Sequence, residues 1–145
     1  MSARENIAIN IVKQLENMTD PALGSVSRVF FDVQKLAITQ FPAIFVTTTD
    51  EAREDISTDL RRGTIRYSLK CYVRGTQIDT LRNEVIERVE EMFETNRGHS
   101  ITLTAENIHN VSTEISSIEV VERELPLGEV AINVDVKYTY KKGVL

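Results

Sequence analysis

The sequence contains little of what disulfides, metal sites and membrane spans require. Its 145 residues include one cysteine, two histidines, three prolines and six glycines. A lone cysteine cannot form an intramolecular disulfide, and no Cys/His pattern has metal-ligand spacing, so the chain suits a reducing cytosol. The N-terminus lacks the apolar stretch of a signal peptide, and no apolar run approaches the roughly 20 residues that cross a bilayer. We therefore expect neither export nor membrane insertion.

Basic charge is also scarce. The 17 Lys and Arg residues are outnumbered by 22 Asp and Glu residues, which gives a formal net charge of -5. Affinity for phosphate backbones comes mostly from clustered Lys and Arg, so this chain is not suited to grip DNA. Hydrophobic residues at 41% and charged residues at 27% are ordinary globular values. With a length typical of one domain, residues 1–145 are expected to fold as a single unit.

Residues for catalysis are not arranged as an active site requires. Cys71 is in phase with the apolar positions of a predicted strand, so its thiol is expected to be an inert core group. His99 and His109 are expected to be solvated, the second in a loop at residues 107–110. Adjacent acids such as Glu90 and Glu91 fit a solvated helix face, and the dispersed glycines form no nucleotide-binding motif. The sequence therefore predicts no enzyme and no catalytic, cofactor-binding or metal-binding residues.

Two segments have the apolar spacing of amphipathic helices. From Ser2 to Met18, apolar residues recur on one face, and Ser2 with Glu5 has the form of a capping box. A second helix is predicted from Thr76 to about Thr95. Its apolar face is formed by Ile78, Leu81, Val85, Val89, Met92 and Phe93.

The remaining apolar segments are typical of strands. They are Val26 to Phe31, Ala43 to Thr49, Ile65 to Val73, Ser100 to Thr104, Val111 to Glu122 and Glu129 to Lys141. The last alternates most regularly, with Val130, Ile132, Val134, Val136, Tyr138 and Tyr140 on one side. The order of elements predicts an α+β fold, a mainly antiparallel sheet with two helices packed on its apolar face.

One segment is too charged to form part of a core. Residues 50–62 are expected to form a projecting charged arm. Loops of this kind are often simple connections, but charges of both signs also suit reciprocal contacts between copies in a ring. The residues predicted to form such a subunit interface are Asp50, Glu51, Arg53, Glu54, Asp55, Asp59, Arg61 and Arg62.

The order of these elements resembles the tail terminator proteins of long-tailed phages, the group that includes the lambda minor tail protein U. The likeness spans an N-terminal amphipathic helix, the strand introduced by Phe41-Pro42-Ala43-Ile44-Phe45-Val46, the charged arm, the strand-Gly-helix unit around Gly75 and the terminal strand. The resemblance implies a virion protein that forms a hexameric ring on the tail tube. Such a ring stops tube growth and joins the tail to the head connector.

The same resemblance implies the partners. They are further copies of the chain, the tail tube protein and the head-tail connector protein, with DNA passing through the lumen without specific binding. Two alternatives stay open at this point. One is another small phage neck or tail protein, such as a head-completion or tube component. The other is a small-ligand-binding α+β module with a pocket lined by Tyr67, Cys71 and Tyr138.

Overall fold

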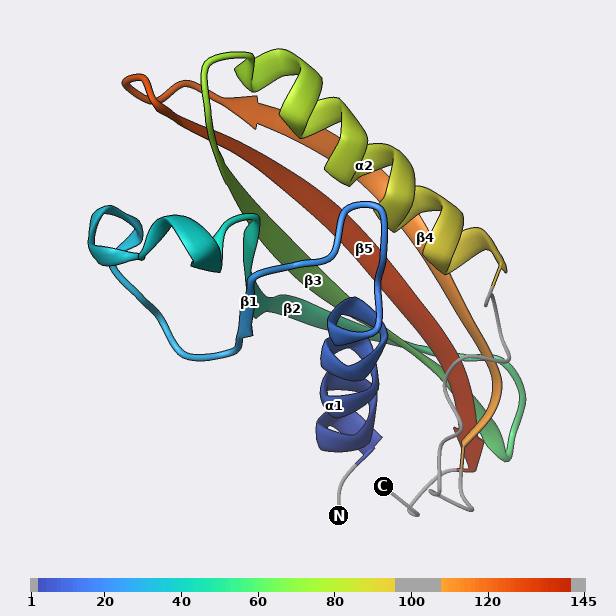
Figure 1. The fold of residues 1–145 in the computed structure, drawn as a ribbon. Coiled ribbons are helices and arrows are strands. Elements are labelled where there is room, and N and C mark those ends of the chain that lie inside the picture. Colours follow the sequence, from blue (N-terminus) through green and yellow to red (C-terminus); the bar gives the residue numbers. More distant parts are fainter. Residues whose placement is uncertain (1–2, 96–107, 142–145) are drawn as a thin grey trace.

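The computed structural model describes residues 3–95 and 108–141, which fold into one sheet with helices packed against it (Figure 1). The described part contains two α-helices, two short 3-10 helices and five strands. In chain order they are α1 (Ala3–Glu16), β1 (Ser25–Ser27), η1 (Val33–Lys35), η2 (Ile38–Gln40), β2 (Ala43–Asp55), β3 (Leu60–Arg74), α2 (Ile78–Thr95), β4 (Ile108–Val121) and β5 (Leu127–Lys141).

The strands are ordered β1-β2-β3-β5-β4 across the sheet. The short strand β1 runs parallel to β2, and the other neighbouring pairs are antiparallel. The long strands β3 and β5 form the centre, paired without interruption from Leu60 with Lys141 to Arg74 with Leu127. The α+β class and the mainly antiparallel sheet are thus confirmed.

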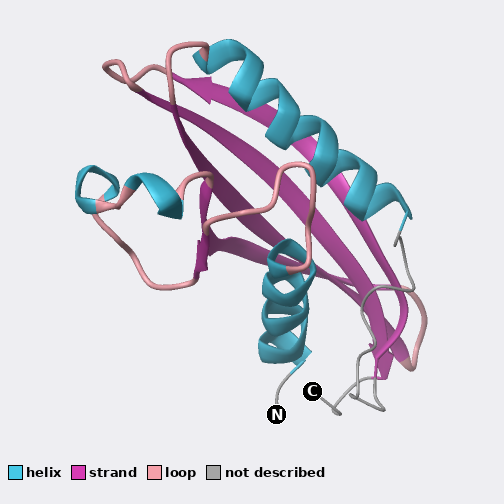
Figure 2. Cartoon of the chain, viewed as in Figure 1, coloured by secondary structure: helices cyan, strands magenta, loops and turns pink. Residues whose placement is uncertain are grey.

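Both helices pack on the same face of the sheet, as predicted (Figures 1 and 2). Strand alternation sends every second residue of β3 and β5 toward that face, and the apolar stripe of each helix covers it. The resulting core includes Ile7, Ile11 and Leu15 from α1, Val85, Val89 and Phe93 from α2, and Ile65, Leu69, Val130, Ile132, Val134, Val136, Tyr138 and Tyr140 from the strands.

A smaller apolar cluster lies on the other face of the sheet. It joins Val33, Ala43 and Tyr72, with Phe31, Phe41 and Phe45 among the half-buried residues around them. The chain between β1 and β2 supplies Phe31, Val33 and Phe41, so this connection covers the β1 end of the outer face. The remaining outer face of the sheet carries polar side chains.

The predicted strand from Val26 to Phe31 is wrong beyond Ser27, where β1 ends. The Ser27 hydroxyl accepts a hydrogen bond from the Val29 amide at 3.0 Å and donates one to the Val29 carbonyl at 2.9 Å. These local bonds compete with strand pairing and turn the chain away from the sheet.

The charged segment 50–62 is likewise not a loop. Residues 50–55 continue β2, residues 60–62 begin β3, and a short turn joins them. The segment is therefore the tip of a β-hairpin, because charged side chains are compatible with strands at a solvated end of a sheet.

Other element boundaries differ less. Helix α1 ends at Glu16 and α2 begins at Ile78, each two residues inside the predicted range. Strand β4 begins at Ile108, so the backbone of His109 pairs with Thr139 instead of lying in a loop. Ser2, His99 and the predicted strand from Ser100 to Thr104 lie outside the described residues.

Candidate protein interface

The β2–β3 hairpin is closed by a turn with three hydrogen bonds. The Ile56 and Ser57 amides donate to the Leu60 carbonyl at 3.0 and 3.2 Å, and the Leu60 amide donates to the Ser57 hydroxyl at 3.2 Å. Beyond Thr49 the two strands pair from Asp50 with Arg66 to Asp55 with Arg61. The turn contains Asp59, and the other seven residues of the predicted interface lie on the paired strands.

Strand alternation divides these seven residues between two faces of the hairpin. The register places Glu51 opposite the buried Ile65 and Asp55 opposite Arg61, on the side that holds the helices. It places Glu54 opposite Arg62 on the outer side. The predicted interface residues are thus contiguous in the sequence but do not form one surface.

On the helix side, Arg53 is the central polar group. Its guanidinium donates a hydrogen bond to the Tyr140 hydroxyl at 2.7 Å, lies 5.2 Å from the centre of that ring, and pairs with Glu51 at 3.3 Å. The hydrogen bond to Tyr140 is the main cause that raises the pKa of Arg53. Glu51 also pairs with Arg4 of α1, so the hairpin is tied to the first helix.

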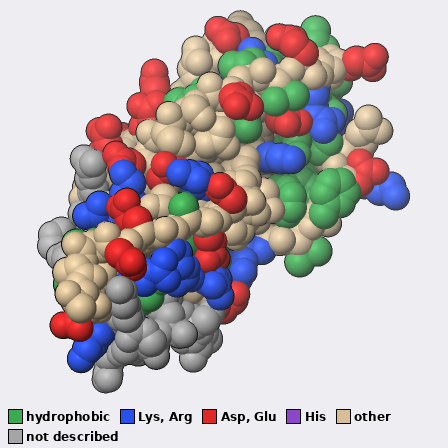
Figure 3. Space-filling view, turned by 180° about the vertical axis from the view of Figure 1, so that it is seen from behind, with side chains coloured by type: hydrophobic (Ala, Val, Ile, Leu, Met, Phe, Trp, Pro, Cys, Tyr) green, Lys and Arg blue, Asp and Glu red, His purple; other side chains and the backbone are tan. Residues whose placement is uncertain are grey.

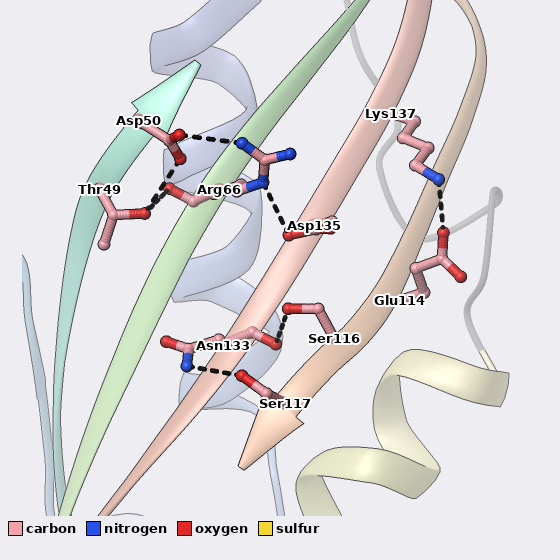
Figure 4. Close-up of polar contacts among 9 residues, drawn as sticks. All are labelled: Thr49, Asp50, Arg66, Glu114, Ser116, Ser117, Asn133, Asp135 and Lys137. Atoms are coloured by element: carbon pink, nitrogen blue, oxygen red, sulfur yellow. Dashed lines mark hydrogen bonds and ion pairs between the residues drawn. The ribbon is translucent and has the colours of Figure 1, made fainter. Parts of the chain in front are cut away.

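The outer face carries a polar ladder that crosses four strands (Figure 4). Arg66 of β3 pairs with Asp50 of β2 at 2.9 Å and with Asp135 of β5 at 3.7 Å. Lys137 of β5 pairs with Glu114 of β4 at 3.0 Å. Opposite charges face one another at each step, so the ladder is neutralised largely within the chain.

The charges of the hairpin are satisfied in the same way. Arg61 pairs with Asp55 and Arg62 with Glu54, both at 3.0 Å. Exposed pairs of this kind contribute little to stability. A side chain whose charge is already balanced by a neighbour in its own chain also gains less from a charged partner in another subunit. The predicted role of these residues in a subunit interface remains a prediction.

The connection between β1 and β2 has the more exposed hydrophobic side chains, since Ile56 and Leu60 at the hairpin turn are only 43% and 39% exposed. We call residues 29–38 the apolar segment. Val29 is 75% exposed, Phe30 is 77% exposed and Ile38 is 70% exposed. In Figure 3, hydrophobic side chains lie on the side of the molecule that holds this connection. Hydrophobic side chains exposed together are typical of surfaces that bind other proteins.

The apolar segment is anchored although its tips are exposed. The rings of Phe31 and Tyr72 meet edge to face with centres 5.7 Å apart, and Phe45 contacts both Phe30 and Phe31 at about 6 Å. Before the segment, Arg28 donates two hydrogen bonds to the Glu5 carboxylate of α1 at 2.7 and 2.9 Å. The Arg28 hydrogen bonds are the main cause that lowers the pKa of Glu5. The exposed residues are therefore held by a fixed support.

At the opposite edge of the sheet, α2 and β4 enclose a groove of about 480 Å³. Phe93, Ile115 and Ile118 supply apolar side chains, and Glu90, Glu94 and Glu114 supply carboxylates. Thr113 also lines the groove, and its buried hydroxyl has no hydrogen-bond partner among the residues that the structure describes. Buried polar atoms are nearly always bonded, so this hydroxyl can accept or donate one further bond.

The three residues of the predicted ligand pocket lie in the core. Cys71 is fully buried, and burial raises the pKa of its thiol, so the reactive thiolate is suppressed. Tyr67 and Tyr138 belong to the same core cluster, and burial raises the pKa of both phenols. A ligand would have to displace core packing to reach the pocket predicted at these three residues.

Within residues 3–95 and 108–141, no group of three or more His, Cys, Asp or Glu side chains is placed to hold a metal ion. In the same ranges no helix combines the length and the hydropathy that a membrane span needs.

Sequence reasoning missed both the apolar segment and the groove. The run Val29-Phe30-Phe31 did carry a signal, because three consecutive apolar residues of one strand cannot all face one core. The groove had no comparable signal, since its residues come from α2 and β4, which only tertiary packing brings together.

No family model matches this chain, and no curated protein sequence matches it.

Proposed function

We propose that this protein is a structural subunit that binds further copies of itself in a ring, as a tail terminator of a long-tailed phage. Its role would be to cap the tail tube, stop tube growth and join the tail to the head connector. The ring would assemble in the host cytoplasm and remain in the tail or neck of the virion.

The observation that carries the proposal is the exposure of Val29, Phe30 and Ile38 on an anchored segment. Exposing three large apolar side chains to water is unfavourable, and covering them with a protein surface recovers the hydrophobic free energy. The α+β fold is compatible with the resemblance in the order of elements that the sequence shows. Together they favour a protein whose surfaces bind other subunits.

The proposed partners follow from the same resemblance. The tail tube protein would contact one side of the ring, and the head-tail connector protein the other. DNA would pass through the lumen without specific binding, which agrees with a chain of net charge -5. Related neck and tail components remain the main alternative, because they share the need for a protein-binding surface.

Native mass spectrometry and light scattering test the proposal, with the protein alone and with purified tail tubes. The expected result is a closed oligomer of defined mass, with six copies as the expected number, formed alone or on the tube. A chain that stays monomeric under both conditions would overturn the proposal. A DNA-binding titration across salt concentrations adds a second test. A DNA-binding role predicts steeply salt-dependent affinity, and the absence of binding would exclude that role.

A further inference from the structure

We infer that the apolar segment of one copy of this chain docks into the α2–β4 groove of the next copy. The inference rests on the proposed ring and names the two surfaces that would meet in it. It assigns the subunit contact to residues outside the charged hairpin.

The positions of the two surfaces suit a head-to-tail contact. The apolar segment follows β1, which is one edge strand of the sheet, and the groove lies along β4, which is the other. In Figure 1 the connection between β1 and β2 extends away from the side of the sheet where α2 runs along β4. Each copy therefore has one apolar segment and one groove at opposite edges, and it can contact a different neighbour through each. Repeating that contact closes into a ring when the rotation between copies allows it.

The chemistry of the two surfaces is complementary. The segment presents Val29, Phe30 and Ile38, and the groove presents Ile118, which is 37% exposed, beside the partly buried Ile115. Phe93 also lines the groove but is only 2% exposed, so it adds little surface for contact. A groove of about 480 Å³ lies within the size range of pockets that bind ligands. An aromatic side chain inserted in such a pocket is a frequent anchor of protein interfaces.

The charges agree with this direction of docking. The groove is acidic at Glu90 and Glu94, and Glu114 is already paired with Lys137. The apolar segment contains the exposed Lys35, between Phe30 and Ile38, and the exposed Asp32, whose carboxylate accepts a hydrogen bond from the Gln34 amide. The segment thus has no net charge, and Lys35 is its one charge opposite in sign to the groove. A carboxylate on the rim of the groove can therefore pair with Lys35 of the incoming copy. Rim charges of opposite sign favour the correct register and speed association.

The unsatisfied hydroxyl of Thr113 is independent support for an occupant. It is 2% exposed, lines the groove, and has no hydrogen-bond partner in the part of the chain that the structure describes. A backbone amide or carbonyl of an entering segment would supply the missing bond once the side chains that cover this oxygen move aside, because the oxygen itself has almost no accessible surface.

Two blocking variants test the contact, each measured by native mass spectrometry at a concentration where the wild-type chain forms rings. Phe30→Asp places a charge on the segment, and Ile118→Asp places one in the groove. Each variant alone is expected to be monomeric, with the contact weakened about 30-fold or more, as for loss of an interface anchor. Leu125→Asp is the matched control, because Leu125 is 73% exposed but belongs to neither surface.

Mixing the two blocked variants gives the most specific result. The mixture retains one intact segment, on the Ile118→Asp copy, and one intact groove, on the Phe30→Asp copy. It is expected to form 1:1 heterodimers and nothing larger. A mixture that stays monomeric would overturn the docking, and so would rings formed by either variant alone.

A charge exchange between the two surfaces is a second test of the docking. Lys35→Glu and Glu94→Lys should each weaken assembly, and the double variant should recover it. If rings persist in the Phe30→Asp chain, the inference fails while the proposed ring survives. If the wild-type chain is monomeric alone and with tail tubes, the proposed function fails too. Thermal melting identifies a blocked variant that does not fold, and Phe30→Ser or Ile118→Thr then replaces it.

Discussion

The hairpin tip and the apolar segment are both exposed, but the first exposes mainly paired charges and the second exposes large hydrophobic side chains. At the hairpin, Arg61 and Arg62 each have an acidic partner on the facing strand. In the apolar segment, Val29 and Phe30 have most of their surface in water. Surface charges are well solvated even without a partner, whereas exposed apolar surface would gain hydrophobic free energy if a partner covered it. A high density of charge is therefore a weaker sign of an interface than a few exposed hydrophobic side chains on a fixed support.

The largest expected effect concerns the support of the apolar segment. Phe31 is half-buried against Phe45 and Tyr72. Phe31→Ala should lower the free energy of unfolding by about 2–3 kcal/mol, less than the loss for a fully buried Phe. Phe30→Ala is the matched control and should cost under about 1 kcal/mol, because an exposed side chain has little packing to lose. Urea denaturation of both variants measures the difference, and equal losses would contradict the distinction between anchor and tip.

A smaller loss is expected at Gly63, next to the hairpin tip. A Cβ added at Gly63 would lie 2.5 Å from Cζ of Tyr138, whose ring fills the space beside this glycine. Gly63→Ala should therefore destabilise the protein by about 1–3 kcal/mol through overpacking. In a Tyr138→Leu background the same change should be neutral or stabilising, because alanine suits a strand better than glycine. Denaturant midpoints of the four chains measure the coupling, and equal effects in both backgrounds would exclude a steric cause.

The charges of the hairpin should matter less. The double change Arg61→Glu and Arg62→Glu is expected to lower the free energy of unfolding by at most about 1–2 kcal/mol, since exposed pairs contribute about 0–1 kcal/mol each. The hypothesis that these residues form a subunit interface predicts weaker oligomerisation as well. Thermal melting and oligomer mass separate the two effects.

An exchanged pair sharpens that experiment. Combining Glu54→Arg with Arg62→Glu keeps the ion pair within the chain but reverses its direction. If the charges act only within the chain, this exchanged variant should match the wild-type chain in both stability and oligomer mass. A smaller oligomer mass than wild type would show that these charges contact a neighbouring subunit.

The smallest expected effect is a pH dependence at the start of the apolar segment. Hydrogen bonds from Arg28 lower the pKa of Glu5 below its ordinary value. A carboxyl group with a lowered folded pKa adds stability above its unfolded pKa and loses it as pH falls through the folded one. The melting temperature of wild type should therefore exceed that of Glu5→Gln near neutral pH, and the difference should vanish in acid. A difference that does not change with pH would mean that the ion pair is not the cause.

Sequence reasoning predicted the elements with regular periodicity. The apolar stripes of α1 and α2 and the alternation of β3 and β5 are local patterns, and each depends only on the geometry of its own element. It misjudged segments whose conformation depends on partners. Residues 50–55 and 60–62 lie in paired strands because β3 pairs with β2 and β5 at once, a condition that a charged sequence does not reveal.

The fold class, the two helices and the burial of Cys71 follow from hydrophobic periodicity, which specifies which face of an element leaves water. Tertiary structure alone decided which charges face one another, since strand register divides residues 50–55 between two faces. It also decided that Val29 and Phe30 remain exposed and that α2 and β4 enclose a groove at the far edge. Exposure and grooves arise from contacts between residues distant in the chain, which no local pattern encodes.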